Sequence, residues 1–496
     1  MVVTGMGMVT GSIIKFLFQS PKWLRAFLVI HWVALIALAI FVTAFCVNAA
    51  FLPLERQWPL SLWDLVLAVA GLKLFSVFLS SLHELRMRQL AGGLPGLALT
   101  HLQWALRFTP GNPELYYAWG HLLYLQGDLS GAREKYKQVT QIFPLDSAAE
   151  VYLGRLELSV GHWQEAHGHF ARAYRLARGI AWNDLREWMP EAVNEAVPHR
   201  FRTSWSKLNF DQEQLDFLIQ GHYLSGHFKL ILQNYQDLLR DLASQNKTAY
   251  PIVLSAEQHA KVLPVLGRNI HISPVPEFPS ELVRIEDTER LEASFQKDGI
   301  LVLDSLLAPD ACEALLHFCQ KSTIWHDDHK SGGYLGSYMD DGFNCPLLYQ
   351  VARELKEKLP GILGAWSLLQ MWGYNHDSQC EGIGLHADAA HVNINLWLTP
   401  ESANQDPEHG GLLVFPLEAP QDWSFQTLNT ETERMQALIQ AEQISPVKIA
   451  YRQNRAVIFR SRFFHATDQV NFKPGYLNRR INITFLYGRY QPDLKP

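Results

Sequence analysis

The feature that most constrains this chain is a long uncharged stretch near its start. Residues 26–54 contain no Asp, Glu, Lys or Arg, and this run is longer than the about 20 residues with which an α-helix crosses the hydrocarbon core of a bilayer. A secretory signal peptide is the alternative, because VNA before Ala50 resembles a small-residue cleavage site. The run is about twice as long as the apolar region of such a peptide, so we expect a transmembrane helix.

A second apolar run, residues 65–81, follows after a short polar loop. Lys73 lies near its middle and would cost roughly 2.5–3.5 kcal/mol in hydrocarbon, so a second membrane helix and a buried or interfacial helix both remain open. Basic residues flank the pair, namely Lys15, Lys22 and Arg25 before it and Arg86 and Arg88 after it. By the positive-inside rule, residues 1–89 form a membrane anchor that leaves the rest of the chain in the cytoplasm.

Composition narrows what the remainder can be. A chain of 496 residues is too long for one hydrophobic core, so several domains are expected. The formal net charge of -6 gives no basic field for a nucleic acid, and we expect no nucleic-acid partner. The five cysteines are odd in number and show no CxxC spacing, which favours a reducing compartment.

The middle of the chain repeats with a period of 34 residues. Gly120, Gly127, Ala132 and Tyr136 recur as Gly154, Gly161, Ala166 and Phe170, and an earlier half unit supplies Gly93, Ala98 and Pro110. These residues resemble the tetratricopeptide repeat, in which small residues let two antiparallel helices approach and an aromatic side chain fills the space between them. The resemblance covers 90–178 and implies an all-α array whose concave surface binds a peptide or protein partner. A spacer between membrane and catalytic domain is the alternative.

The segments after the repeats divide the rest of the chain. Residues 179–248 are expected to be a further helical region, since 210–242 looks like a degenerate helix pair. Residues 249–280 are proline-rich and aperiodic, which predicts a linker. From 281 to 496, helical patterns at 309–320 and 347–359 precede strand patterns at 367–374, 391–398, 410–415, 455–461 and 479–488. Helices followed by short alternating strands predict a sheet sandwich flanked by helices.

Candidate metal ligands lie at the start of one strand pattern. Apolar and polar residues alternate from His391 to Leu398, as on a strand with two different faces. If this pleat extends back through Leu385, His386 and Asp388 share one face and can converge on a metal. A second histidine is then required from elsewhere, and His465 follows an apolar strand pattern that ends at Phe459.

A third group of polar residues suits a ligand that carries a carboxylate. Arg480, Asn482 and Thr484 alternate with Ile481, Ile483 and Phe485. A strand of this kind can turn its guanidinium and hydroxyl toward a cavity, where an arginine fork binds a carboxylate. Arg479 should face the opposite way. Tyr374, on an upstream strand pattern, is a further candidate to bind the same ligand, whereas His376, His391 and His409 are expected to face solvent or to support the ligands from outside.

Taken together, these residues resemble the iron(II)/2-oxoglutarate-dependent dioxygenases. The motif residues are His386, Asp388, His465, Arg480 and the glycine pair Gly410–Gly411, and the glycine pair and HxD strand are most similar to prolyl hydroxylases. The resemblance covers about 289–490. It implies a double-stranded β-helix (jelly roll), iron(II) on His386, Asp388 and His465, and 2-oxoglutarate on Arg480 with Thr484, Asn482 and Tyr374. The implied reaction uses dioxygen to hydroxylate a substrate while 2-oxoglutarate yields succinate and carbon dioxide.

Three functions are compatible with this layout. Anchor, repeats and oxygenase domain together also resemble the aspartyl/asparaginyl β-hydroxylases, although those lack the carboxylate ligand that Asp388 supplies in this chain. The first hypothesis is a membrane-anchored hydroxylase of a peptide or protein recruited by the repeats. The second is an oxygenase of a lipid or small hydrophobic metabolite, and the third is a catalytically inactive membrane-anchored scaffold.

Overall fold

The computed structural model describes residues 95–181, 202–328 and 333–489, with some positions between 73 and 86. Within these ranges, no helix combines the length and the apolar character that crossing a bilayer requires. The expected span 26–54 lies outside the described residues, as does most of the expected span 65–81. The membrane anchor therefore stays a prediction from the sequence.

The chain divides into two compact units, residues 1–135 and 136–496. In the first unit, helices α4 (Pro95–Phe108) and α5 (Pro113–Leu125) enclose a small apolar core. This core is formed by Ala98, Leu102, Ala105, Leu115 and Leu122. Helix α6 (Leu129–Ile142) continues the chain into the second unit.

The helix boundaries follow the 34-residue period of the sequence. Helices α4, α6 and α8 begin at residues 95, 129 and 163, and α5 and α7 begin at residues 113 and 147. Within the second unit, Gly154 of α7 (Ser147–Ser159) faces Phe170 of α8 (Trp163–Arg178). A Cβ at Gly154 would lie 3.0 Å from the Phe170 ring, so the glycine permits the close approach. Assignment of these helices to the tetratricopeptide family remains a prediction.

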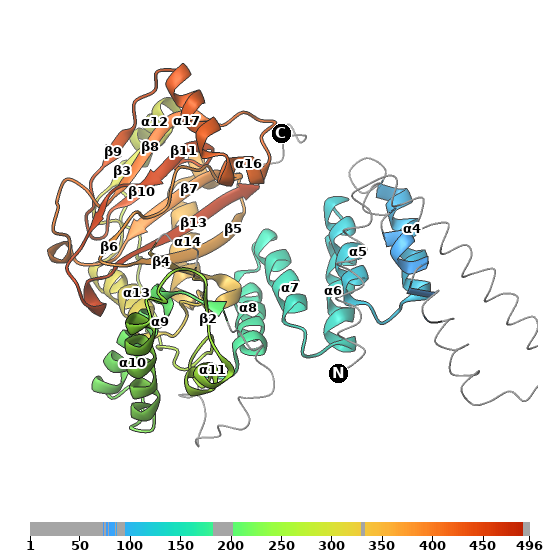
Figure 1. Cartoon of the computed structure of the whole chain (residues 1–496). Helices are drawn as coiled ribbons and strands as arrows, with labels where there is room; N and C mark the ends of the chain where they lie inside the picture. Colours follow the sequence, from blue (N-terminus) through green and yellow to red (C-terminus); the bar gives the residue numbers. More distant parts are fainter. Residues whose placement is uncertain are drawn as a thin grey trace, which may run out of the picture. The chain divides into compact units, whose positions relative to one another are not determined.

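The last helix pair, α7 and α8, is built into the core of the second unit. Phe170 and Tyr174 of α8 belong to the same apolar core as the main sheet, and Figure 1 shows α8 beside the lower end of that unit. The Tyr174 hydroxyl donates to the carbonyl oxygen of Thr323 at 2.7 Å, and Arg178 forms an ion pair with Asp341 at 2.7 Å. A fragment that starts at residue 281 would expose this core.

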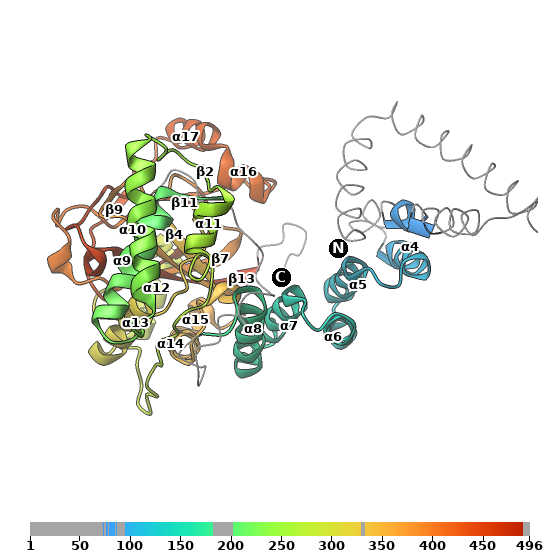
Figure 2. The ribbon, with the colours of Figure 1, turned by 60° about the horizontal axis from the view of Figure 1, so that its bottom comes forward.

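The helices expected at 179–248 are α9 (Trp205–Gln220) and α10 (Phe228–Ser244), which Figure 2 shows side by side. The segment 249–280, however, is not a free linker. It contains strand β2 (Ile252–Val253), paired with β1 (Arg202–Thr203), and helix α11 (Ala256–Val262). Its apolar residues Val262, Leu266 and Ile270 complete the α9–α10 core, because the prolines interrupt helix formation without preventing burial.

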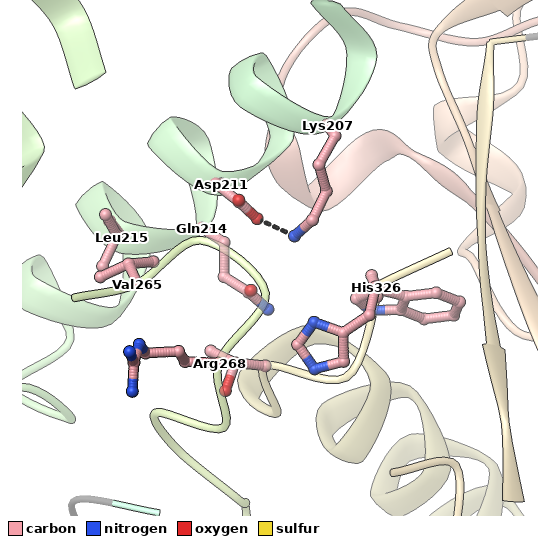
Figure 3. Close-up of a pocket in the computed structure, with 9 residues that line it drawn as sticks. Lys207, Asp211, Gln214, Leu215, Val265, Arg268 and His326 are labelled. Carbon is pink, nitrogen blue, oxygen red and sulfur yellow. Dashed lines mark hydrogen bonds and ion pairs between the residues drawn. The ribbon is translucent and has the colours of Figure 1, made fainter. Parts of the chain in front are cut away.

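A narrow cavity of about 10 Å³, lined largely by polar side chains, lies where α9 meets the chain at 323–326. Figure 3 shows Lys207 directed at Asp211, with the side chains of Gln214 and His326 below this pair. Burial raises the pKa of Asp211, and the nearby Lys207 ammonium opposes this rise. Gln214 donates to the carbonyl oxygen of Ser322 at 3.0 Å. We assign this cluster a structural role, since it fixes α9 on the rest of the second unit.

The second unit contains a six-stranded sheet and a smaller three-stranded sheet, in which all neighbouring strands are antiparallel. The large sheet has the order β3 (Ile300–Leu303), β10 (Ala456–Arg460), β7 (Ala390–Trp397), β13 (Arg480–Arg489), β5 (Leu368–His376) and β4 (Tyr334–Tyr338). The small sheet has the order β11 (Phe463–Thr467), β8 (Leu412–Glu418) and β9 (Val447–Ile449). A short pair, β12 (Val470–Asn471) and β6 (Gln379–Cys380), adjoins them.

The two faces of the large sheet have different neighbours. On one face, Ile394, Ile483 and Met371 pack in the core that includes residues of α13 (Pro309–Lys321) and α14 (Pro346–Lys358). On the other face, Trp397 and Phe459 pack with residues of β8. Helices α12 (Thr288–Asp298) and α15 (Pro360–Leu363) complete the unit. The arrangement fits the jelly-roll-like domain expected from the sequence, with every predicted strand segment forming a strand.

Candidate metal centre

Three side chains from two separate stretches of the chain, 386–388 and β11, converge on one point. His386, Asp388 and His465 each offer one ligand atom, and these atoms all lie within 4.8 Å of one another. The backbones of the two histidines pair directly, since each amide donates to the other's carbonyl oxygen, at 3.0 and 2.8 Å. Within the described ranges, this is the only group of three potential ligands close enough to hold one metal ion.

The HxD stretch is not an extension of β7, which is a correction to our expectation. Strand β7 begins at Ala390, and His386 instead forms an isolated bridge with His465 of β11, because the chain here crosses from one sheet to the other. The alternation of faces nevertheless persists. Leu385, Ala387 and Ala389 pack in an apolar cluster, while the intervening His386 and Asp388 face His465.

Hydrogen bonds orient each candidate ligand. The Nδ1 atoms of His386 and His465 lie 2.8 and 2.9 Å from the carbonyl oxygens of Gly384 and Phe463. A carbonyl oxygen only accepts, so each Nδ1 carries the proton and each Nε2 offers a lone pair. Burial lowers the pKa of His465 well below its ordinary value, and repulsion from His386 adds to the effect. His465 is therefore neutral near pH 7, as a metal ligand must be.

The donor set fits iron(II). Two imidazole nitrogens and one carboxylate form the facial triad of non-haem iron(II) oxygenases, which leaves positions open for other ligands. The carboxylate is held in turn, because Asn393 donates to Asp388 Oδ2 at 2.6 Å and accepts from Asn395 at 2.8 Å. Both asparagines lie on the alternating face that the sequence predicted for β7.

Replacing Asn393 tests this outer hydrogen bond. We expect Asn393→Ala to weaken metal binding about 10- to 100-fold, because the Asp388 carboxylate loses the donor that orients it. Anaerobic titration with Co(II), followed by visible absorption, gives the dissociation constant. Asn344→Ala is the control, since Asn344 donates to the carbonyl of His167 instead. Equal affinity in the two variants would show that Asn393 does not support the site.

Arg480 is a buried cation on the same face as the triad's asparagine network. Only 2% of its surface is exposed, and burial lowers its pKa to about 10, which leaves it charged at neutral pH. It donates to the carbonyl oxygens of Gly410 and Gly411, at 2.6 and 3.3 Å, and to Asn482 Oδ1 at 2.9 Å. A guanidinium carries five N–H groups, so two remain for another acceptor.

No carboxylate of the described residues forms an ion pair with Arg480, whereas its neighbour Arg479 has two. Arg479 contacts Glu213 at 2.9 Å and Asp377 on the opposite face of β13. A buried charge without a counter-ion is costly. An anionic ligand at Arg480 would remove that cost. Arg479 needs no such ligand, because Glu213 and Asp377 already balance its charge.

The glycine pair has a steric explanation. Gly410 has a φ of 82°, in the left-handed region that favours glycine, and a Cβ at Gly411 would overlap the carbonyl oxygen of Ile449 on β9. These two residues thereby bring the carbonyl oxygens that Arg480 contacts into place.

We expect Gly411→Ala to lower the free energy of unfolding by about 3 kcal/mol, since a backbone atom cannot yield as a side chain would. Urea denaturation measures this loss. Gly384→Ala is the matched control, because a Cβ at Gly384 meets nothing within 4 Å. An equal, small effect of both substitutions would contradict the steric account.

The remaining candidates contact residues outside the triad. Tyr374 pairs with Asn482 across β5 and β13, and its hydroxyl is 3.4 Å from that of Tyr338. Thr484 donates to Asn395 at 3.2 Å. His391 instead stacks on Trp366 at 3.7 Å, and His409 pairs with Asp406 at 3.0 Å.

Three further residues surround Arg480, and one of them, His376, was expected to face solvent or to support the ligands from outside but is fully buried. His376 lies opposite Arg480 in the β5–β13 register, with its Nε2 atom 3.2 Å from Asn482 Oδ1. The rings of Trp397 and Tyr451 each lie 5.8 Å from the Arg480 guanidinium. The period-two pattern did place His376 on the face of Tyr374 and Trp397 on the face of Asn395, so this signal was present. Nothing in the sequence indicated Tyr451.

No known family model matches the chain, and no curated protein matches it. Among solved structures, the non-haem α-ketoglutarate-dependent epimerase SnoN from nogalamycin biosynthesis is 12% identical over 42% of this chain and 87% of its own, with a TM-score of 0.30. HygX from Streptomyces hygroscopicus, solved with nickel and 2-oxoglutarate, is 14% identical over 40% and 86%, with a TM-score of 0.30. A Pseudomonas putida prolyl-4-hydroxylase is 12% identical over 41% and 100%, with a TM-score of 0.27. Because these identities and TM-scores are low, the assignment of the candidate metal ligands rests on the side chains of this chain alone.

Proposed function

We propose that this protein is an iron(II)/2-oxoglutarate-dependent dioxygenase that hydroxylates a peptide or protein substrate. One observation carries the proposal: the convergence of His386, Asp388 and His465, with Nδ1 of each histidine bonded to a backbone carbonyl oxygen and His465 Nε2 3.6 Å from Asp388 Oδ2. The buried Arg480, which keeps two N–H groups available, supports a dicarboxylate cosubstrate.

In this proposal, iron(II) on the triad supplies the oxidative chemistry of dioxygen and 2-oxoglutarate. The residues of the chain bind, orient and exclude water. Asn393 fixes the Asp388 carboxylate, and Arg480 binds the distal carboxylate of 2-oxoglutarate through a charge-assisted hydrogen bond. Trp397 beside Arg480 and Phe459 beside His465, both fully buried, would exclude water from these groups. Succinate and carbon dioxide leave as coproducts of hydroxylation.

The substrate class and the cellular site belong to the same proposal. The helices with the 34-residue period would recruit a peptide or protein partner, as tetratricopeptide repeats do. The uncharged run 26–54 would anchor the chain in a membrane, with the repeats 90–178 and the oxygenase domain 281–496 in the cytoplasm. The packing of α8 in the same core as the main sheet supports recruitment by the repeats, since a partner bound near α8 would lie close to Tyr338 of β4.

Turnover of 2-oxoglutarate tests the reaction class. Many such sites consume the cosubstrate slowly without their main substrate, so full-length protein with iron(II), 2-oxoglutarate and dioxygen should produce succinate. We expect succinate, measured by NMR, to depend on iron and to disappear in Asp388→Ala. Succinate at the same rate in Asp388→Ala would exclude this site as its source. If no succinate forms with a screened peptide library either, the reaction class is wrong.

A further inference from the structure

The segment between β8 and β9, residues 419–446, lies against the outer side of the candidate metal ligands. It contains helices α16 (Phe425–Thr430) and α17 (Thr432–Ala441). Its buried side chains share one apolar cluster with residues next to the ligands, and the members are Leu428, Met435, Ile439, Ala387 and Phe464. Ala387 lies between His386 and Asp388, and Phe464 precedes His465 in the chain. One cluster therefore contacts both stretches that carry ligands.

The backbone of the HxD stretch depends on this segment as well. Three consecutive amides donate to three different places: His386 to the carbonyl of His465 at 3.0 Å, Ala387 to that of Leu428 at 3.1 Å, and Asp388 to that of Ser461 at 3.0 Å. Since β7 begins only at Ala390, no strand ladder fixes these residues. The bond to Leu428 is the middle anchor of the three.

The contacts continue outward to the protein surface. The ring of Trp423 lies 5.9 Å from that of Phe464, and the guanidinium of Arg434 on α17 lies 4.5 Å from the Trp423 ring. The β8–β9 segment thus packs behind the ligands from Arg434 at the surface to Phe464 beside His465. The side chain of Ala387 is fully buried beneath it.

We infer that the β8–β9 segment is a positioning element that holds the metal ligands in binding geometry. Ligand side chains must be held to within about 0.5 Å for tight binding. In this site Leu385, Ala387 and Ala389 pack against the segment, while His386 and Asp388 face the proposed metal position. Loss of its apolar contacts therefore weakens metal binding more than an equal loss of folding stability elsewhere in the chain would. This inference rests on the proposed metal site.

The test uses the full-length chain and Co(II) as the probe. Leu428→Ala removes the buried side chain, Leu428→Met keeps its volume, and Leu218→Ala creates a matched cavity in the separate α9–α10 core, where Leu218 is fully buried. We expect Leu428→Ala to weaken Co(II) binding about 10-fold or more and to alter the visible Co(II) spectrum. Leu428→Met and Leu218→Ala should both bind as the wild type does, although Leu218→Ala melts at a lower temperature.

Two results separate failure of this inference from failure of the proposed function. If the wild type binds Co(II) and Leu428→Ala binds it equally well, with a melting temperature lowered as in Leu218→Ala, the segment is structural only. If the wild type binds no Co(II), both the metal site and this inference are wrong. Should Leu428→Ala fail to fold, Leu438→Ala at the half-buried rim of the cluster is judged by the same comparison with the wild type.

Discussion

His465→Ala is expected to abolish specific metal binding. The Nε2 atom of His465 is one of three ligands, and loss of a supporting outer hydrogen bond alone costs about 10- to 100-fold in affinity, so loss of a ligand should cost more than about 100-fold. The protein should still fold, because His465 is a buried neutral side chain whose backbone bonds to His386 remain. Anaerobic calorimetry with Co(II) measures the affinity.

His391→Ala is the control for this substitution. His391 stacks on Trp366 and lies outside the group of three ligands, although it is only three residues from Asp388. We expect its metal affinity to equal that of the wild type. If His391→Ala loses the metal while His465→Ala keeps it, His465 is not a ligand and the triad is wrong.

Arg480→Ala is expected to remove 2-oxoglutarate binding while leaving the metal in place. Truncating one partner of a buried, hydrogen-bonded charge pair costs about 2–5 kcal/mol, which corresponds to at least about 30-fold in the dissociation constant. Arg480→Lys should recover only part of this loss, since an ammonium cannot reproduce the guanidinium fork. Calorimetric titration of the Co(II)-loaded protein with 2-oxoglutarate measures the change.

Arg479→Ala tests whether 2-oxoglutarate binding needs Arg480 itself or only a positive charge nearby. Arg479 pairs with Glu213 and Asp377 on the other face of β13, so its loss should lower stability without changing the affinity for 2-oxoglutarate. Equal weakening of 2-oxoglutarate binding by both substitutions would contradict the assignment of Arg480 to the cosubstrate. Weaker Co(II) binding in Arg480→Ala would show that the two sites are not separate.

The strands that carry the site could be predicted because each alternates strictly. Residues 480–485 separate Arg480 and Asn482 from Ile481 and Ile483 by period alone, and the structure buries the two pairs on opposite faces. The helix starts from 95 to 163 likewise follow the 34-residue period seen in the sequence. A repeating pattern of this kind depends only on backbone geometry, which is local.

Features that depend on contacts distant in sequence could not be predicted. The prolines of 249–280 indicated a linker, yet burial of Ile270 depends on α9 and α10 being adjacent. The HxD stretch resembled the start of β7, but its partner is His465, which lies 79 residues after His386 in the chain. Support of Ala387 by Leu428 has no local signal either, since it arises from the fold of the β8–β9 segment.

The most direct test of the iron and 2-oxoglutarate assignment is anaerobic addition of iron(II) and then 2-oxoglutarate to the full-length protein, followed in the visible spectrum. We predict a charge-transfer band when 2-oxoglutarate binds the metal, absent in His465→Ala and weakened in Arg480→Ala. A folded wild-type protein that shows no band at saturating concentrations of both would contradict the assignment, and the inactive scaffold would then be the better description.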